Sequence, residues 1–101
     1  MTVTRWNNFK SLYFIMHYTY VLHSEKDKKR YIGYTHDLKL RLNQHHEAKV
    51  QSTKHRRPLR LIYYEACLEE WDARKREKYF KTHYGRMYLM KRLKFWHDKH
   101  S

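Results

Sequence analysis

The stretch RYIGYTHDLKLRLNQHH, residues 30–46, decides the fold, because a strand changes into a helix within it. Arg30–Tyr34 is rich in aromatic and β-branched residues, a composition typical of strands. Thr35 or Asp37 can then accept hydrogen bonds from the free backbone N–H groups at the start of a helix. We therefore expect a helix from about Leu38 to His46.

The segments on either side of this stretch predict a small α/β domain. Tyr18–Leu22 has strand composition and precedes a polar turn, so it should form an antiparallel hairpin with the strand that begins at Arg30. Leu59–Ala66 is almost continuously apolar, which is typical of a central strand. Helices are expected over Glu70–Lys81 and Arg86–Trp96. The predicted fold is a three-stranded, mainly antiparallel sheet flanked by helices in the order ββαβαα.

The chain of 101 residues is long enough for one domain, and no repeat or linker divides it. We assign the domain to residues 16–95, preceded by a dispensable extension over 1–15 and followed by a tail over 96–101. The apolar run near residue 12 lacks the length and the small-residue cleavage site of a signal peptide. No apolar run approaches the roughly 20 residues that span a membrane.

Charge and cysteine content indicate the class of partner. With 23 Lys and Arg against 10 Asp and Glu, the net charge of +13 favours a polyanion, most commonly nucleic acid. A basic surface kept for solubility is the alternative, and an anionic membrane is disfavoured because no long basic amphipathic helix is present. The lone Cys67 excludes an intramolecular disulfide and fits a reducing, cytoplasmic location without disulfide-linked partners.

Two polar residues in the predicted helix over 38–46 stand beside its apolar stripe. Leu38 and Leu42 lie 40° apart on a helix and form that stripe. Arg41 and His45 have the same spacing and are placed at its edge, where they can reach across the hairpin. Packing alone does not explain these two residues.

A carboxylate occupies an unexpected position in the next predicted helix. Ala73, Glu77 and Phe80 are spaced i, i+4, i+7 and so share the face that should contact the sheet. Burying a charge there is costly unless a partner compensates it. Glu77 either takes an edge position, from which it extends to solvent or pairs with Arg76, or serves as a metal ligand or an acid held in a cleft.

Together these residues resemble the GIY-YIG nuclease superfamily, and within it the small bacterial branch of stand-alone single domains. Tyr18-Thr19-Tyr20 corresponds to the first half of the family motif and Tyr31-Ile32-Gly33 to the second. Thr19 stands where the family usually has an apolar residue. The resemblance covers about residues 16–94 and rests on five separated positions, Tyr20, Tyr31, Arg41, His45 and Glu77.

The resemblance implies a divalent-metal-dependent DNA endonuclease that acts in DNA repair, recombination or the processing of structured DNA. Gly33 would let the backbone turn without a side chain that obstructs the cleft. A nucleic-acid-binding module of the same fold that does not cut is the alternative. A basic structural subunit of a ribonucleoprotein is a third reading. DNA is expected more than RNA, and no membrane partner is expected.

The same resemblance suggests a role for each residue of the cleft. Glu77 would hold one Mg²⁺ or Mn²⁺, and Arg41 would clamp the phosphate. Tyr20 would act as the general base, with Tyr31 bonding the water or phosphate beside it. His45 would position the tyrosine or relay its proton. For this chemistry near neutral pH, the cationic surroundings are expected to lower the pKa of the phenol.

A basic loop follows the predicted helix over 38–46 and ends at Pro58. Lys54, Arg56 and Arg57 are expected to contact phosphates along a bound strand, which adds affinity without sequence choice. The alternative is a solvated basic loop.

Overall fold

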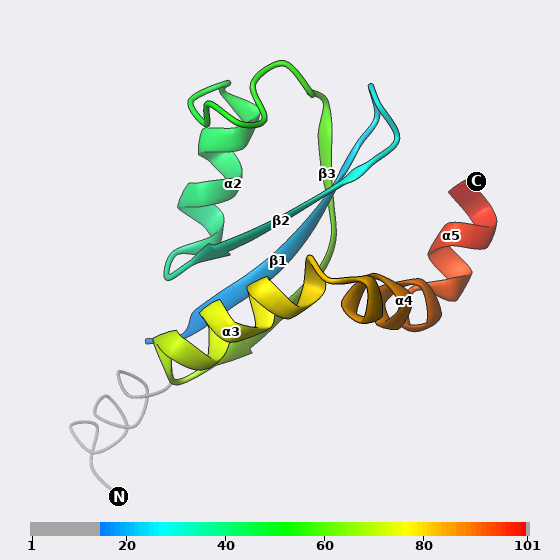
Figure 1. Cartoon of the computed structure of the whole chain (residues 1–101). Coiled ribbons are helices and arrows are strands. Elements are labelled where there is room, and N and C mark those ends of the chain that lie inside the picture. Colours follow the sequence, from blue (N-terminus) through cyan, green and yellow to red (C-terminus); the bar gives the residue numbers. More distant parts are fainter. Residues whose placement is uncertain (1–14, 101) are drawn as a thin grey trace, which may run out of the picture.

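The strand β1 lies in the middle of a three-stranded antiparallel sheet, with the order β2-β1-β3. The computed structural model describes residues 15–100, so the predicted extension lies almost wholly outside the described residues. The strands are β1 (His17–Ser24), β2 (Arg30–Thr35) and β3 (Leu59–Cys67) (Figure 1).

The expectation that the third strand is central is therefore wrong. β1 is buried at every position from Thr19 to Ser24, whereas every residue of β3 is partly or fully exposed. The sequence was misleading because β1 buries polar residues that find hydrogen-bond partners, among them Thr19 and Ser24. Tyr64, in the apolar run of β3, is instead half exposed.

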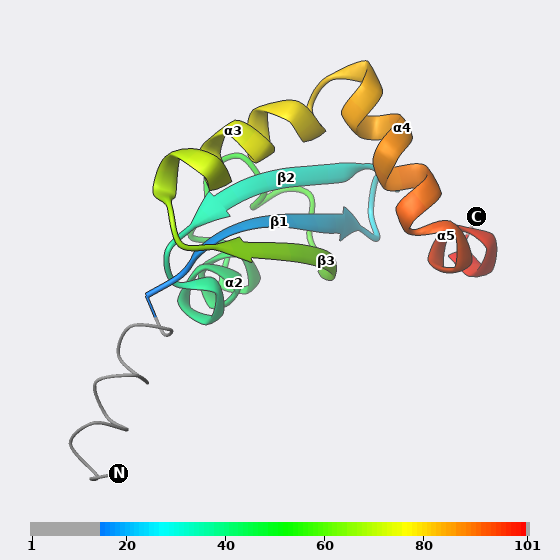
Figure 2. The same cartoon turned by 90° about the horizontal axis from the view of Figure 1, so that it is seen from below.

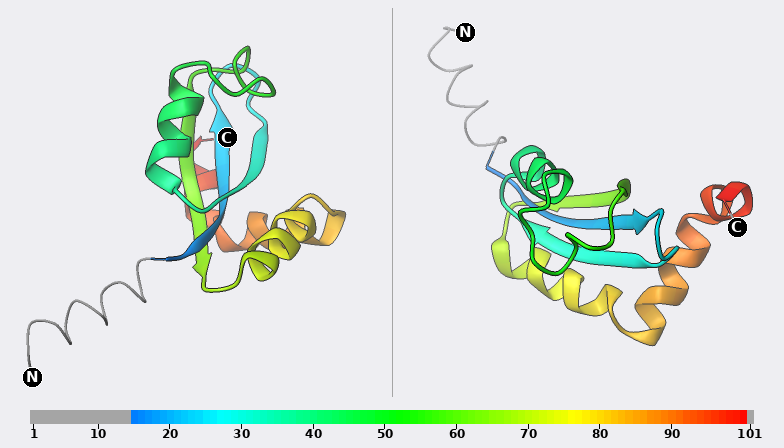
Figure 3. Two further views of the ribbon diagram at one scale, coloured as in Figure 1. Left: turned by 90° about the vertical axis from the view of Figure 1, so that its left-hand side faces the viewer. Right: turned by 90° about the horizontal axis from the view of Figure 1, so that it is seen from above.

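Helices cover both faces of the sheet. The helix α2 (Leu38–His46) lies on one face, and α3 (Glu70–Phe80) with α4 (His83–Arg92) lies on the other (Figures 2 and 3). A last helix, α5 (Lys94–His100), follows α4 after a break at Leu93, so the predicted single helix is two. No helix within residues 15–100 has the length and apolar character needed to cross a bilayer.

Capping residues set the first residues of α2 and α4. For α2 the observed bounds are those that the sequence predicts. The Asp37 side chain accepts a hydrogen bond from the Leu40 backbone N–H at 3.1 Å, which caps the first turn of α2. Thr82 caps α4 in the same way by accepting from Gly85. This cap starts α4 three residues before the predicted start at Arg86, which explains the difference.

The apolar core lies between the sheet and the α3–α4 pair. It consists of four buried residues from four elements, Val21, Ile32, Phe80 and Leu89. A register shift in the β1–β3 pairing lies next to Val21. On this face two neighbouring residues of β3, Ile62 and Tyr63, both pack against the core, whereas successive side chains of a regular strand point to opposite faces.

Two polar contacts fix α3 on the sheet. The Thr19 hydroxyl donates to the Ala73 carbonyl at 2.7 Å in a buried position, which gives a physical reason for a threonine at this position. The Arg76 guanidinium donates two hydrogen bonds to the Glu65 carboxylate of β3, at 2.8 and 3.0 Å. α3 is thus tied to the central strand and to one edge strand.

Truncation of the core should separate buried from exposed positions on one helix. Leu89→Ala should lower the free energy of unfolding by roughly 2–5 kcal/mol, because it opens a cavity in a fully buried site. Met87→Ala on the same helix is the control, since Met87 is 43% exposed. Urea unfolding followed by circular dichroism measures both. Equal losses for the two variants would contradict this description of the core.

Candidate active site

The phenol of Tyr20 lies at the centre of a buried polar cluster on the α2 side of the sheet. Tyr20 is fully buried, and its hydroxyl oxygen is 2.7 Å from Nε2 of His45. Because successive residues of a strand point to opposite faces, Tyr20 faces α2 while its neighbour Thr19 faces α3. The two predicted site residues Tyr20 and His45 are therefore in direct contact.

The hydrogen-bonded chain continues from His45 into the basic loop. Nδ1 of His45 is 2.7 Å from the hydroxyl oxygen of Thr53, which is fully buried. Sequence reasoning does not identify Thr53, because the cations dominate the composition of this loop. A hydroxyl residue among charged residues is the only sign of Thr53 in the sequence. Because hydroxyl residues are common in loops, this sign does not single it out. We call Tyr20, His45 and Thr53 the buried triad.

Tyr31 and Gly33 complete the surroundings of the triad from β2. The Tyr31 ring lies 5.2 Å from the His45 ring and 6.3 Å from the Tyr20 ring, measured between centroids. Gly33 pairs with Tyr20 across the sheet, and a Cβ at Gly33 would lie 2.3 Å from Cζ of Tyr20. The predicted backbone turn at Gly33 is wrong, because the residue lies within β2. The glycine instead leaves room for the Tyr20 ring.

Burial dominates the electrostatics of the phenol. It raises the pKa of Tyr20 to about 12, while Arg41 lowers the pKa and the charges of Tyr31 and Glu77 raise it. The expectation that cationic surroundings lower this pKa is therefore wrong for the structure as it stands. Arg41 and Glu77 thus act on the phenol in opposite directions.

His45 is neutral at physiological pH. Burial lowers its pKa to about 4, and the positive charge of Arg41 adds to this shift. A neutral imidazole has one N–H donor and one acceptor nitrogen. His45 therefore donates one of its two hydrogen bonds in the triad and accepts the other.

Glu77 is partly buried at the edge of the sheet-facing side of α3. Its side chain is 23% exposed, and Oε2 is 3.2 Å from Nζ of Lys81. The alternative that Glu77 pairs with Arg76 is wrong, because Arg76 pairs with Glu65. A surface groove borders the carboxylate and is lined by Trp71, Arg74, Lys75, Glu77, Lys78 and Lys81.

This environment is compatible with one weakly held metal ion. Within residues 15–100, no group of three or more His, Cys, Asp or Glu side chains is arranged to hold a metal. Mg²⁺ commonly needs only one or two carboxylates, with water and substrate phosphate filling the other positions. Glu77 could supply that carboxylate once its exposed pair with Lys81 opens.

Arg41 and the cations of the basic loop have different surroundings. Nη1 of Arg41 donates to the neutral Gln44 side chain at 3.0 Å. Arg56 donates to Asp27 at 2.6 Å and to two backbone carbonyls of β2 and its preceding turn. Arg57 donates to the carbonyls of Lys54 and His46. Arg56 therefore anchors the loop, a task that the sequence did not reveal.

Removal of the small Thr53 hydroxyl should lower the free energy of unfolding substantially, because the group is buried and hydrogen-bonded to His45. Thr53→Val keeps the shape but leaves a buried nitrogen of His45 without a partner, which costs about 1–3 kcal/mol. Thermal or urea unfolding measures the loss. Ser52→Ala, which removes an exposed hydroxyl from the neighbouring position, is the control and should be nearly neutral. Equal stability of Thr53→Val and wild type would contradict the buried triad.

The lowered pKa of His45 predicts a loss of stability in acid. The unfolded chain binds a proton near pH 6.5, while folded His45 binds one only near pH 4. The unfolded state therefore gains protons first, and the free energy of unfolding falls as the pH drops from about 6.5 to 4. Urea unfolding across this range should show a shallower fall for His45→Gln. The exposed control His55→Gln should keep the wild-type slope, and identical slopes for all three proteins would refute the prediction.

The sequence is similar to those of several known bacterial proteins. The "UPF0213 protein" of Bacillus pumilus is 42% identical over 67 residues, which cover 65% of this chain and 67% of that protein. "UPF0213 protein YazA" of Bacillus subtilis is 41% identical over 66 residues, covering 64% of this chain and 66% of that one. The aligned stretch thus spans about two thirds of the length of these relatives.

A solved structure and a family model extend this comparison. The solution NMR structure of the UPF0213 protein BH0048 from Bacillus halodurans has a TM-score of 0.49 and 29% identity, covering 75% of this chain and 83% of that one. The family model described as the GIY-YIG catalytic domain matches residues 16–92, which include the β-sheet, α2 and α3. The chain belongs to the GIY-YIG family of nuclease catalytic domains.

Proposed function

We propose that the protein is a divalent-metal-dependent endonuclease that hydrolyses phosphodiester bonds in DNA, in repair, recombination or the processing of structured DNA. The observation that carries this proposal is the 2.7 Å contact between the Tyr20 hydroxyl and His45, within reach of the charges of Arg41 and Glu77. A hydroxyl, an imidazole, a guanidinium and a carboxylate are together the groups that phosphodiester hydrolysis uses.

The buried triad gives the attacking water a path for its proton. Tyr20 accepts a proton from water as its own hydroxyl proton passes to Nε2 of His45. In this arrangement Nδ1–H of His45 donates to Thr53, which fixes the tautomer. Protonation of His45 is unfavourable without an anion nearby, since burial lowers its pKa. The negative phosphate of a bound substrate raises that pKa and makes the transfer easier.

Arg41 is suited to bind the phosphate that is attacked. Its side-chain partner Gln44 is neutral, and Arg41 forms no ion pair among residues 15–100, so its charge remains available. A guanidinium can contact two phosphate oxygens at once. Glu77 would hold a divalent cation, whose positive charge would lower the pKa of nearby water or phenol and offset charge that develops on the phosphate.

A nucleic-acid-binding module that does not cut is the second candidate function. The raised pKa of Tyr20, about 12, favours it, because a phenol this weakly acidic does not ionise near neutral pH. Both candidates predict nucleic-acid binding. Cleavage is the property that separates them, and the variant below tests it together with the metal site.

Glu77→Gln keeps the shape of the side chain and removes the charge of the proposed metal ligand. We expect cleavage of plasmid and branched DNA in Mg²⁺ to fall by about 10²–10³ or more, the scale on which loss of one preorganised electrostatic group acts. Binding measured in EDTA should survive. Stability should change little, because an exposed i,i+4 ion pair contributes about 0.3–0.5 kcal/mol.

Glu70→Gln is the matched control for this experiment. Glu70 lies on the same helix and makes the same kind of i,i+4 pair, with Arg74 at 2.7 Å. This variant should cut at the wild-type rate, and wild-type cleavage should stop in EDTA. A folded Glu77→Gln protein that still cuts at the parent rate would refute the metal-site assignment. Absence of cutting by the wild type on all substrates would favour the binding module.

A further inference from the structure

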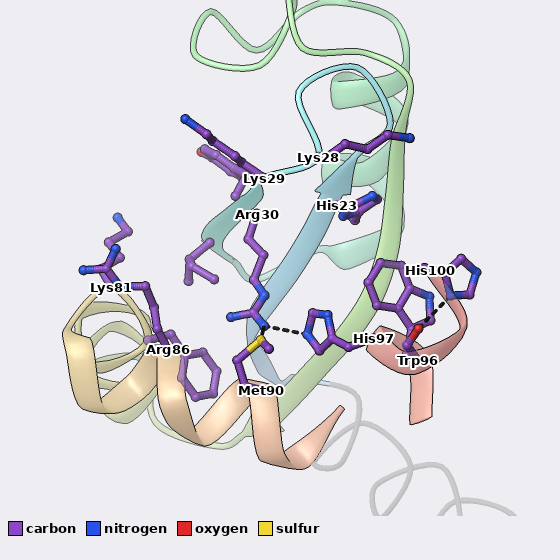
Figure 4. Close-up of a pocket in the computed structure, with 13 residues that line it drawn as sticks. His23, Lys28, Lys29, Arg30, Lys81, Arg86, Met90, Trp96, His97 and His100 are labelled. Carbon is purple, nitrogen blue, oxygen red and sulfur yellow. Dashed lines mark hydrogen bonds between the residues drawn. The ribbon is translucent and has the colours of Figure 1, made fainter. Parts of the chain in front are cut away.

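We propose that a cationic cavity beside the candidate active site binds a short single-stranded extension of the DNA substrate, an inference that rests on the proposed function. The cavity has a volume of about 1040 Å³ and lies between the β1–β2 hairpin and the α4–α5 segment (Figure 4). We call it the hairpin cavity. It is separate from the buried triad, which lies on the α2 side of the sheet.

The charge of the hairpin cavity favours an anion. Five of its lining residues are cationic and come from the hairpin turn, β2, the end of α3 and α4, namely Lys28, Lys29, Arg30, Lys81 and Arg86. Among the described lining residues there is no Asp or Glu. A concave surface with charge of one sign concentrates ligands of the opposite sign.

Arg30 supplies the more specific observation. Its guanidinium lies in the middle of the cavity, where Nη2 is 2.6 Å from Nε2 of His97 and 3.0 Å from Sδ of Met90 (Figure 4). Within residues 15–100, Arg30 has no carboxylate partner. Burial lowers the pKa of both Arg30 and His97. A partly buried cation held by neutral groups is poorly compensated, and a phosphate would supply the missing charge.

One ion pair joins the hairpin cavity to the candidate active site. Tyr31 belongs to the cavity wall, but its ring lies on the α2 side of the sheet, against Tyr20 and His45. Lys81 lines the cavity and pairs with Glu77. A nucleic-acid strand that enters the cavity therefore lies near Glu77, the proposed metal ligand.

The size of the cavity favours one strand over a duplex. Its volume is that of a small-molecule site, about 300–1,000 Å³, which suits a few nucleotides. A DNA duplex is much larger, since its major groove alone is about 12 Å wide. The aromatic ring of Trp96, which lines the cavity, is of the kind on which unpaired bases stack. The occupant we propose is thus an unpaired extension of the substrate.

Binding measured in EDTA tests this inference without cleavage. Fluorescence anisotropy should compare a blunt duplex with the same duplex that carries an unpaired extension of about four nucleotides. Wild-type protein should bind the extended duplex about tenfold more tightly, which corresponds to about 1.4 kcal/mol of binding free energy. The indole N–H resonance of Trp96, assigned with Trp96→Phe, should shift only with the extended duplex.

Matched double variants separate the cavity from general charge. Lys29→Ala with Arg86→Ala removes two exposed cations from the cavity, and Lys91→Ala with Lys99→Ala removes two exposed cations outside it. Both should weaken blunt-duplex binding equally, because both lower the net charge by two. Only the cavity variant should lose the preference for the extension. Because all four residues are exposed, both variants should fold.

Each possible result bears on the inference. Equal wild-type affinity for the two duplexes, an unchanged Trp96 resonance, or equal loss of preference in both double variants would overturn it. A preference for the extension in EDTA, together with no cleavage in Mg²⁺, would contradict the proposed endonuclease but support the cavity. Cleavage without that preference would overturn the cavity alone.

Discussion

The helix α2 and the loop that follows it depend on a buried polar contact, the hydrogen-bonded chain from Tyr20 through His45 to Thr53. His45 is the one residue of α2 that is buried, and Leu40 of the same helix is 53% exposed. A buried polar group that loses its partner costs about 1–3 kcal/mol, so this chain is a substantial constraint. The groups proposed for catalysis therefore also hold the fold together on this side of the sheet.

This arrangement links chemistry to stability. On the α3 side an apolar cluster of Val21, Phe80 and their neighbours holds the helices, and no proposed catalytic group is needed there. On the α2 side the same atoms serve both purposes. Substitutions at Tyr20 or His45 are expected to affect folding and activity together. Glu77 is less subject to this coupling, because its side chain pairs with the exposed Lys81 and not with a buried group.

Much of the fold could be predicted because its signals are local. The Asp37 cap and the apolar stripe are contained within a few residues, and they determined the bounds of α2 correctly. The central position of β1 could not be predicted in this way, because it depends on partners for Thr19 that are distant in sequence.

In the candidate site too, some contacts could be predicted from the sequence and others could not. The resemblance to the GIY-YIG family implies that Tyr20 and His45 meet, and they are in contact. It could not reveal Thr53 or the anchoring of Arg56 to Asp27, since both contacts come from loop conformation. It also suggested the wrong direction for the pKa of Tyr20, because burial is a property of the whole fold and outweighs one nearby cation.

The hydrogen bond from Thr19 to the Ala73 carbonyl also limits how far α3 can slide along the sheet. In an α-helix that carbonyl accepts the backbone N–H of the residue four positions later, which is Glu77. Thr19 thus contacts the same peptide group as Glu77, while the next residue, Tyr20, reaches His45 on the opposite face. Two consecutive residues of β1 therefore fix the positions of α3 and α2 relative to each other. A slip of α3 by one turn, about 5.4 Å, would break this bond and carry the carboxylate away from the phenol.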